Sequence, residues 1–128
     1  MRMQIEQMRT EVYWEISNFS FIFYLIATIS ESYDSIAPVL TLNAIDPDEG
    51  SNAEVEYEIS ASSPAQAKSK FRIDRKRGEI YLTENLDYET QREYMFQVVA
   101  RDLGKNIQRS SETSIIIFGV NIELYKEQ

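Results

Sequence analysis

The chain has 128 residues, the length of one domain with a short tail, and its 13 basic and 21 acidic residues give a formal net charge of −8. Such an acidic surplus repels phosphate backbones and anionic lipid headgroups, so it argues against nucleic-acid or membrane-surface partners and favours cations. Cys and His are absent, which excludes disulfides, thiolate zinc sites and catalytic mechanisms that need a thiol or an imidazole.

Two patterns mark the start of the chain. In residues 1–18 apolar residues recur every three or four positions with Arg and Glu between them, which predicts a short amphipathic helix. The apolar run of residues 19–29 is too short to cross a bilayer, which needs about twenty residues. Its aromatic and β-branched residues favour a buried strand, and acidic residues upstream disfavour the alternative of a cleaved secretory signal. Asn18-Phe19-Ser20 matches the acceptor pattern for N-glycosylation.

From residue 36 onward, apolar and polar residues alternate with a period of two, as expected of strands with one buried face. Turn-forming segments separate these strands at intervals of about 8–12 residues, and no helix is predicted among them. The pattern is typical of a β-sandwich. Seven strands are predicted: the run before Glu31 and strands near residues 39–44, 55–59, 71–73, 80–82, 94–100 and 114–120.

Asp46 and Asp48 lie two residues apart in a Gly-containing turn, so both carboxylates can converge on one cation. Calcium is the natural candidate, because it takes about six to eight oxygen ligands. An EF-hand loop counted from Asp46 fails, because Ser51 and Tyr57 stand where that loop requires Gly and Glu. Taken alone, such a turn is more often a solvated surface loop than a metal site.

The remaining acidic residues strengthen the case for a cation, because strands of alternating direction gather them at the two ends of a sandwich. Each end then holds three carboxylates whose mutual repulsion destabilises the fold unless a divalent cation neutralises it. The two predicted sets are Asp46, Asp48 and Asp102 at one end, and Glu31, Asp87 and Glu89 at the other.

Several further motifs lie in order over about residues 25–121. The main ones are Ile29-Ser30-Glu31, Ala44-Ile45-Asp46-Pro47-Asp48-Glu49-Gly50-Ser51-Asn52, Leu86-Asp87-Tyr88-Glu89 and Ala100-Arg101-Asp102-Leu103-Gly104. In these motifs and their order the chain resembles an extracellular cadherin repeat. Tyr88 stands where many classical adhesive members carry Arg, so the chain is more like the protocadherin, Fat and Dachsous branches.

The resemblance implies an all-β, seven-stranded Greek-key immunoglobulin-like β-sandwich over residues 23–122, preceded by an extension (1–22) and followed by a tail (123–128). It also implies Ca2+ at two junctions between repeats. Asp46, Asp48, Asp102 and the main-chain carbonyl of Asn52 would bind it at the junction with a preceding repeat, and Glu31, Asp87 and Glu89 at the junction with a following one.

In function, the resemblance implies a calcium-binding repeat of a cell-surface adhesion protein on the extracellular side of the plasma membrane, and not an enzyme. Calcium would stiffen the junctions between repeats for homophilic adhesion between cells. The implied partners are adjacent cadherin repeats and cadherin-type proteins on apposed cells. Neither nucleic acid nor direct membrane insertion by this chain is expected.

Two departures from the family pattern affect this expectation. After its last strand a repeat normally continues Asp-x-Asn-Asp-Asn, and here the stretch is Gly119-Val120-Asn121-Ile122-Glu123. Asn121 keeps one ligand, but two acidic ligands are lost, so a weak C-terminal site is predicted. Trp14 lies too far before Glu31 to match the anchor of strand-swapping members, so a buried or interface aromatic is the better interpretation.

Two alternatives remain open from the residues. One is a β-sandwich that binds a protein partner and has lost effective calcium binding. The other is an enzyme that uses Asp87 and Glu89 as acid and base, which is disfavoured because the two share one short loop, whereas glycosidase carboxylates face each other across a cleft.

Overall fold

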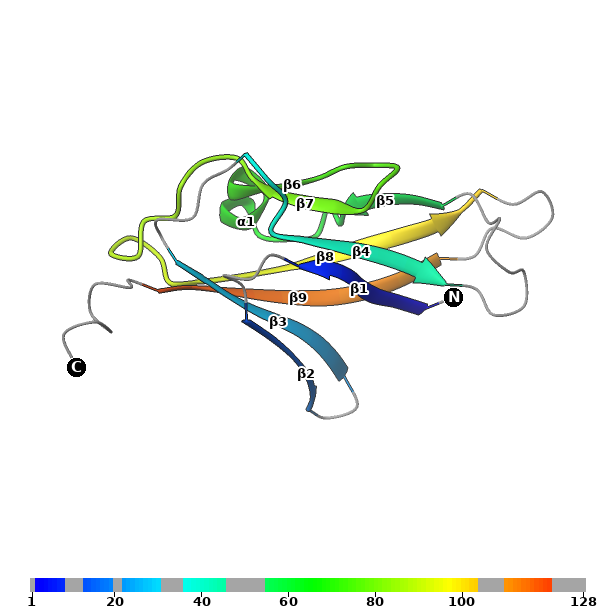
Figure 1. Ribbon diagram of the computed structural model, residues 1–128, viewed down its shortest axis with the longest axis horizontal. Helices are drawn as coiled ribbons and strands as arrows, with labels where there is room; N and C mark the ends of the chain where they lie inside the picture. Colours follow the sequence, from blue (N-terminus) through cyan, green and yellow to red (C-terminus); the bar gives the residue numbers. More distant parts are fainter. Residues whose placement is uncertain are drawn as a thin grey trace.

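A computed structural model describes residues 2–8, 13–19, 22–30, 36–45, 55–103 and 110–120. These residues form nine strands and one helix, arranged as two sheets that pack face to face (Figure 1). The predicted β-sandwich is therefore confirmed, and all seven predicted strands are present. The predicted domain boundaries at residues 23 and 122 stay a prediction.

The first sheet has four strands in the order β1-β4-β7-β6, and all its pairs are antiparallel. Its strands are β1 (Arg2–Met8), β4 (Leu40–Ile45), β7 (Glu79–Leu82) and β6 (Phe71–Ile73).

The second sheet has five strands in the order β2-β3-β9-β8-β5. Only β3 and β9 run parallel among these described pairs. Its strands are β2 (Tyr13–Phe19), β3 (Ile22–Ser30), β9 (Ser110–Val120), β8 (Glu93–Asp102) and β5 (Val55–Ile59).

The core lies between the sheets and follows the period-two pattern. On β8 every second residue from Tyr94 to Asp102 is buried. Phe71 from the opposite sheet stacks on Phe96 with ring centroids 5.2 Å apart and meets Tyr94 edge-on at 5.5 Å. Aromatic pairs at these spacings add to the free energy gained from burying their area.

The amphipathic helix predicted for residues 1–18 is wrong, because β1 and β2 occupy this part of the chain. In β1, Ile5 pairs with Leu42 of β4, and in β2, Trp14 pairs with Ala27 of β3. Sheet edges offer rows of backbone donors and acceptors to any segment that can pair with them. That pairing outweighs a weak helical spacing, which is a local preference only.

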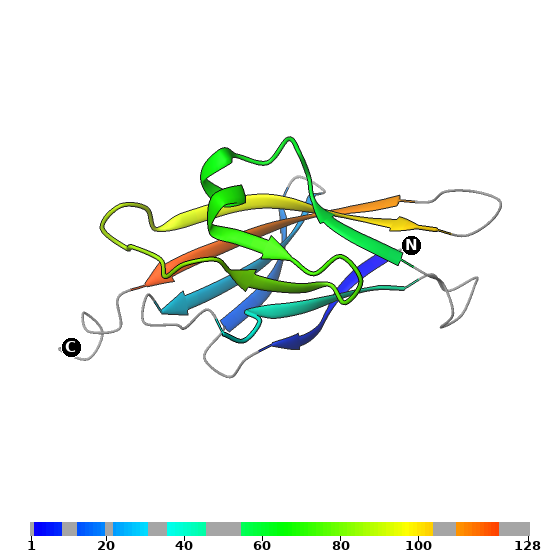
Figure 2. The ribbon, with the colours of Figure 1, turned by 90° about the horizontal axis from the view of Figure 1, so that it is seen from above.

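The prediction that no helix lies within the domain is also wrong. The helix α1 (Ala65–Lys70) follows Pro64 and is followed by Phe71, whose backbone is extended. Its sequence, AQAKSK, is rich in residues that favour helices, but it is too short to show a helical period. Ala67 is buried, and α1 packs on β8, as the view from above shows (Figure 2).

Candidate metal centre

The turn that contains Asp87 and Glu89 lies between β7 and β8 and fixes the Asp87 carboxylate. One carboxylate oxygen accepts a hydrogen bond from the backbone N–H of Glu89 (3.0 Å), and the other accepts one from Thr90 Oγ1 (2.6 Å). The backbone oxygen of Asp87 accepts from the N–H groups of Thr90 (3.1 Å) and Gln91 (3.0 Å). A short polar side chain that caps its own turn in this way is held in one orientation.

These contacts keep the Asp87 carboxylate charged. The hydrogen bond from the Thr90 hydroxyl, followed by that from the Glu89 N–H, lowers the pKa of Asp87 below its ordinary value. The positive charge of Lys70 acts in the same direction. A carboxylate with a lowered pKa suits a cation ligand and does not suit a general acid, which must hold a proton near neutral pH.

Leu86 anchors this turn to the end of the second sheet. It is buried, and a Cβ at Gly119 of β9 would lie 3.4 Å from its Cδ1. The N–H of Gly119 donates to the backbone oxygen of Arg92 (2.7 Å) just beyond the turn. Val120 at the end of β9 pairs with Ser30 at the end of β3. The Asp87 turn and the ends of β3 and β9 therefore share one end of the sandwich (Figure 1).

Asp102 lies at the opposite end, because Asp87 precedes β8 and Asp102 is its last residue. The ten residues of β8 separate the two by about 30 Å at about 3.3 Å per residue. Asp102 pairs with Val55 at the start of β5, and only 1% of its surface is exposed. Figure 1 shows β4 and β8 ending on this side of the molecule.

Tyr57 joins the two sheets near this end. Its side chain belongs to β5 of the second sheet, and its hydroxyl oxygen accepts a hydrogen bond from the N–H of Ala44 in β4 (2.9 Å). Ala44 lies two residues before Asp46 in the sequence. The bond therefore fixes the last residues of β4 relative to the strand that pairs with Asp102.

The other residues predicted as ligands lie outside the described residues, namely Glu31, Asp46, Asp48, Asn52 and Asn121. Within the described ranges, no group of three or more Asp, Glu, His or Cys side chains is placed to hold a metal ion. Nor do these ranges contain a helix long and apolar enough to cross a bilayer. The structure thus brings Asp87 and Glu89 together in one turn and places Asp102 at the other end.

Sequence analysis missed two residues that position this chemistry. Thr90 stands three residues after Asp87, and that spacing is a known signal for a side-chain cap, so the sequence could have shown it. Tyr57 lies in the strand predicted near residues 55–59, and nothing in that strand's pattern assigns its hydroxyl a partner. Its partner Ala44 is 13 positions away, so no local pattern indicates that bond.

The oxygen atoms predicted as metal ligands at the two ends of the sandwich are of the kind that calcium binds. Carboxylate and carbonyl oxygens are the ligands that Ca2+ takes, and the sequence has no Cys or His that would favour zinc instead. The two oxygens of Asp87 each accept one hydrogen bond, and an ionised carboxylate has about four acceptor sites, so capacity for a cation is left.

Comparison with known proteins identifies a family and finds protocadherins among the similar proteins. The family model described as "Cadherin domain" matches residues 26–118. Human Protocadherin-12 is 44% identical over 68 residues, which are 53% of this chain and 6% of that protein. Human Protocadherin-17 is 47% identical over 68 residues, with the same shares covered. The chain thus spans only a small part of the curated relatives it matches.

A solved structure agrees with these matches at the level of the fold. The third cadherin domain of human protocadherin 7 superposes with a TM-score of 0.68, and the match covers 92% of each chain at 22% sequence identity. At this identity the likeness concerns the fold alone. The resemblance predicted from the motifs, including its leaning toward protocadherins, is confirmed by the family and sequence matches.

Proposed function

Because the chain belongs to the cadherin domain family, we propose that it is one calcium-binding repeat of a protocadherin-like adhesion protein on the extracellular side of the plasma membrane. Cadherin domains are adhesion modules and not enzymes, so the expectation of no enzymatic activity is confirmed. The observation that carries the calcium proposal is the Asp87 turn, where hydrogen bonds hold an ionised carboxylate at one end of the sandwich.

Each end of the sandwich contributes half of a site in this proposal. Asp87 and Glu89, with Glu31 and Asn121, would hold calcium shared with a following repeat. Asp102, with Asp46, Asp48 and the carbonyl of Asn52, would hold calcium shared with a preceding one. A bound calcium ion supplies positive charge that cancels the repulsion between carboxylates of adjacent repeats. The junction then becomes stiff, and the rod can present its faces for homophilic contact with cadherin-type proteins on an apposed cell.

A weaker site at the Asp87 end is supported by Gly119. The family pattern has an acidic ligand in this stretch, whereas here Gly119 is a buried strand residue beside Leu86. This observation favours, as second candidate, a β-sandwich that binds a protein partner and has lost effective calcium binding.

Thermal unfolding in excess EDTA and in millimolar calcium separates the two candidates. A ligand at about 100 times its dissociation constant adds roughly 2.7 kcal/mol, which raises the Tm of a domain this size by several degrees. The proposal predicts such a rise. Coincident melts, even at ten times more calcium, would leave the second candidate.

Two matched variants assign the site. Asp87→Asn keeps the size of the side chain and removes its charge, so it should shrink the calcium-dependent rise in Tm. Asp74→Asn is the control, because Asp74 also caps a turn, accepting from the N–H groups of Lys76 (2.9 Å) and Arg77 (2.8 Å), and also has a lowered pKa. A control that loses the same rise would refute the assignment to Asp87. Asp48→Ala should remove the part of the rise due to the other end.

A further inference from the structure

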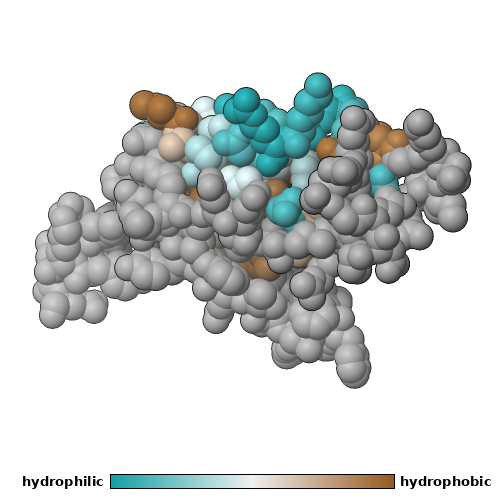
Figure 3. Space-filling view, turned by 45° about the vertical axis from the view of Figure 1, so that its right-hand side comes forward, coloured by the Kyte–Doolittle hydropathy of each residue, from teal (hydrophilic) through white to brown (hydrophobic). Residues whose placement is uncertain are grey.

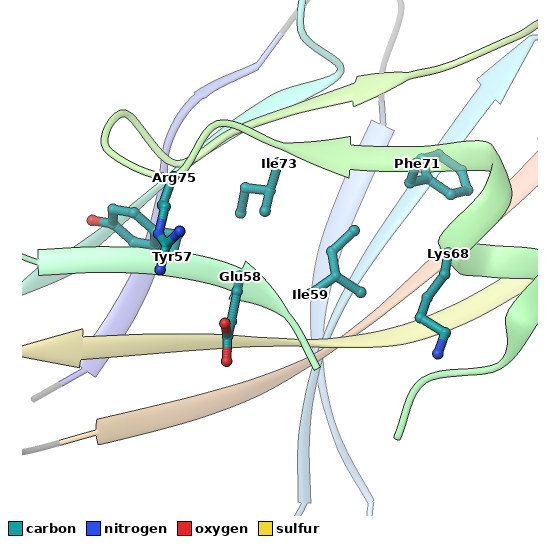
Figure 4. A pocket seen from close by; sticks show the side chains of 7 residues that line it. All are labelled: Tyr57, Glu58, Ile59, Lys68, Phe71, Ile73 and Arg75. Carbon is teal, nitrogen blue, oxygen red and sulfur yellow. The ribbon is translucent and has the colours of Figure 1, made fainter. Parts of the chain in front are cut away.

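The two sheets part along one side of the sandwich, where β5 and β6 are the outermost strands of their sheets. A groove of about 370 Å³ lies between them. Figure 4 shows Ile59 of β5 and Ile73 of β6 facing each other across its middle, with Arg75 at one end and Lys68 at the other. Both isoleucines are half-buried, so the floor of the groove is apolar and open to solvent.

Backbone groups of β6 point into this groove. The N–H of Asp74 donates to the oxygen of Glu79 (2.8 Å), and the N–H of Thr83 donates to the oxygen of Lys70 (2.8 Å). Alternate residues of an antiparallel strand bond to the same neighbour, so residues 70, 72 and 74 face β7. The N–H and C=O of Ile73 therefore face away from β7, into the groove.

The same reasoning orients β5. The N–H of Ser60 donates to the oxygen of Gln97 (2.7 Å), so residues 56, 58 and 60 face β8 and the backbone groups of Tyr57 and Ile59 face outward. The N–H of Tyr57 confirms this, because it donates to the oxygen of Arg75 (2.8 Å). That bond closes one end of the groove, and β5 and β6 are not paired as strands of one sheet.

The groove borders the most basic part of an acidic chain. Residues 68–77 contain six of the 13 basic residues and one acidic residue, Asp74. The hydrophilic side chains over this region are visible in Figure 3. Lys68 Nζ donates to the oxygen of Ala61 (3.0 Å), and Arg75, with a side chain 70% exposed, pairs with Glu56 (3.3 Å). Glu58, the acidic residue lining the groove, is paired with Arg101.

From these features we propose that the groove binds an extended acidic peptide segment of a partner protein. The peptide adds as a strand to the free edge of β6 and bonds to the N–H and C=O of Ile73. One apolar side chain lies over Ile59 and Ile73, and carboxylates on either side of it lie near Lys68 and Arg75. A peptide with an acidic residue two positions before and two positions after an apolar one meets this requirement, because every second side chain of a strand points to the same face. The calcium sites proposed above play no part in this binding.

The test uses the whole chain and a fluorescein-labelled peptide of sequence Glu-Thr-Ile-Thr-Glu, and binding is followed by fluorescence anisotropy. Binding should occur equally in EDTA and in calcium. A Lys-Thr-Ile-Thr-Lys peptide should bind at least tenfold more weakly, because its charges repel Lys68 and Arg75. The acidic peptide with methylated backbone nitrogens should also bind at least tenfold more weakly, because it cannot pair as a strand. Equal binding of the methylated and parent peptides would overturn the proposal.

Matched charge reversals locate the site. The double variant Lys68→Glu/Arg75→Glu should weaken binding at least tenfold. The control Lys76→Glu/Arg77→Glu changes the net charge by the same amount, but at residues that do not line the groove, so it should have a small effect. Equal loss in both double variants, together with tight binding of a heparin oligosaccharide, would show a general polyanion surface and refute the peptide groove.

Two further measurements keep the test independent of misfolding. Ile73→Pro removes the N–H that faces the groove and leaves the pairing of Arg72 with Tyr81, so a folded variant should lose binding. In the unmodified chain, the amide NMR signals of Ile59 and Ile73 should shift on titration with the acidic peptide. Shifts confined to the ends of the sandwich would overturn the proposal.

Discussion

Replacing Gly78 with alanine should destabilise the sandwich, because the β6–β7 turn brings this residue against the backbone of β4. Gly78 has a φ of +70°, and a Cβ there would overlap the carbonyl oxygen of Leu42. A left-handed conformation costs an L-residue roughly 1–2 kcal/mol. Moving the backbone to relieve the overlap would also weaken the hydrogen bond from the N–H of Leu42 to the oxygen of Gly78 (2.9 Å), which is worth about 0.5–1.5 kcal/mol. The expected loss in unfolding free energy is therefore about 1.5–3.5 kcal/mol.

Urea unfolding of the calcium-free chain, followed by circular dichroism, measures this loss as a shift in midpoint at constant slope. Gly119→Ala is the matched control, because its nearest neighbour would be Leu86 Cδ1 at 3.4 Å, an ordinary contact, and its φ is not positive. The control should stay within about 1 kcal/mol of the parent. This prediction is refuted if Gly78→Ala has the same urea midpoint as the parent, or if Gly119→Ala is destabilised more than Gly78→Ala.

Tyr57→Phe should cost about 1–3 kcal/mol, because the half-buried N–H of Ala44 loses its acceptor; a urea curve that overlays the parent's would contradict this. Phe71→Ala should cost about 3–5 kcal/mol by calorimetry and Phe71→Leu clearly less, so equal losses would argue against a packed aromatic cluster. The lowered pKa of Asp87 stabilises the fold fully above its ordinary value of 3.8, and this contribution is lost as the pH falls through the lower folded value. Asp87→Asn should therefore flatten the acid limb of the calcium-free stability profile, and an unchanged limb would contradict the role of the turn.

Much of the sandwich was predictable because alternation along a strand is a local property. The buried side chains of β8, including Tyr94, Phe96, Val98 and Ala100, follow directly from the period-two pattern. The short helix α1 escaped prediction because its six residues are too few to show a helical period, and its place is fixed by Ala67 packing into the core.

The residues of the candidate calcium sites can be predicted from the sequence. The contacts that hold these residues in place can be predicted only in part. The identities of Asp87, Glu89 and Asp102 come from motifs, and alternating strands indicate their ends of the fold. The Asp87–Thr90 bond is local and could have been read from the spacing. In contrast, the Tyr57 bond to Ala44 and the contact of Leu86 with Gly119 join distant segments, so they could not.

The sequence by itself determined an acidic, cysteine-free and histidine-free chain and a two-sheet all-β fold, and it predicts carboxylates suited to calcium at the two ends of that fold. Each follows from composition, from side-chain alternation or from motif spacing. Only the tertiary structure decided that residues 2–8 and 13–19 are strands and that β3 runs parallel to β9. The groove between β5 and β6 likewise follows only from the tertiary structure. The physical reason is that pairing between strands depends on which edges the rest of the chain leaves available, and no local pattern contains that information.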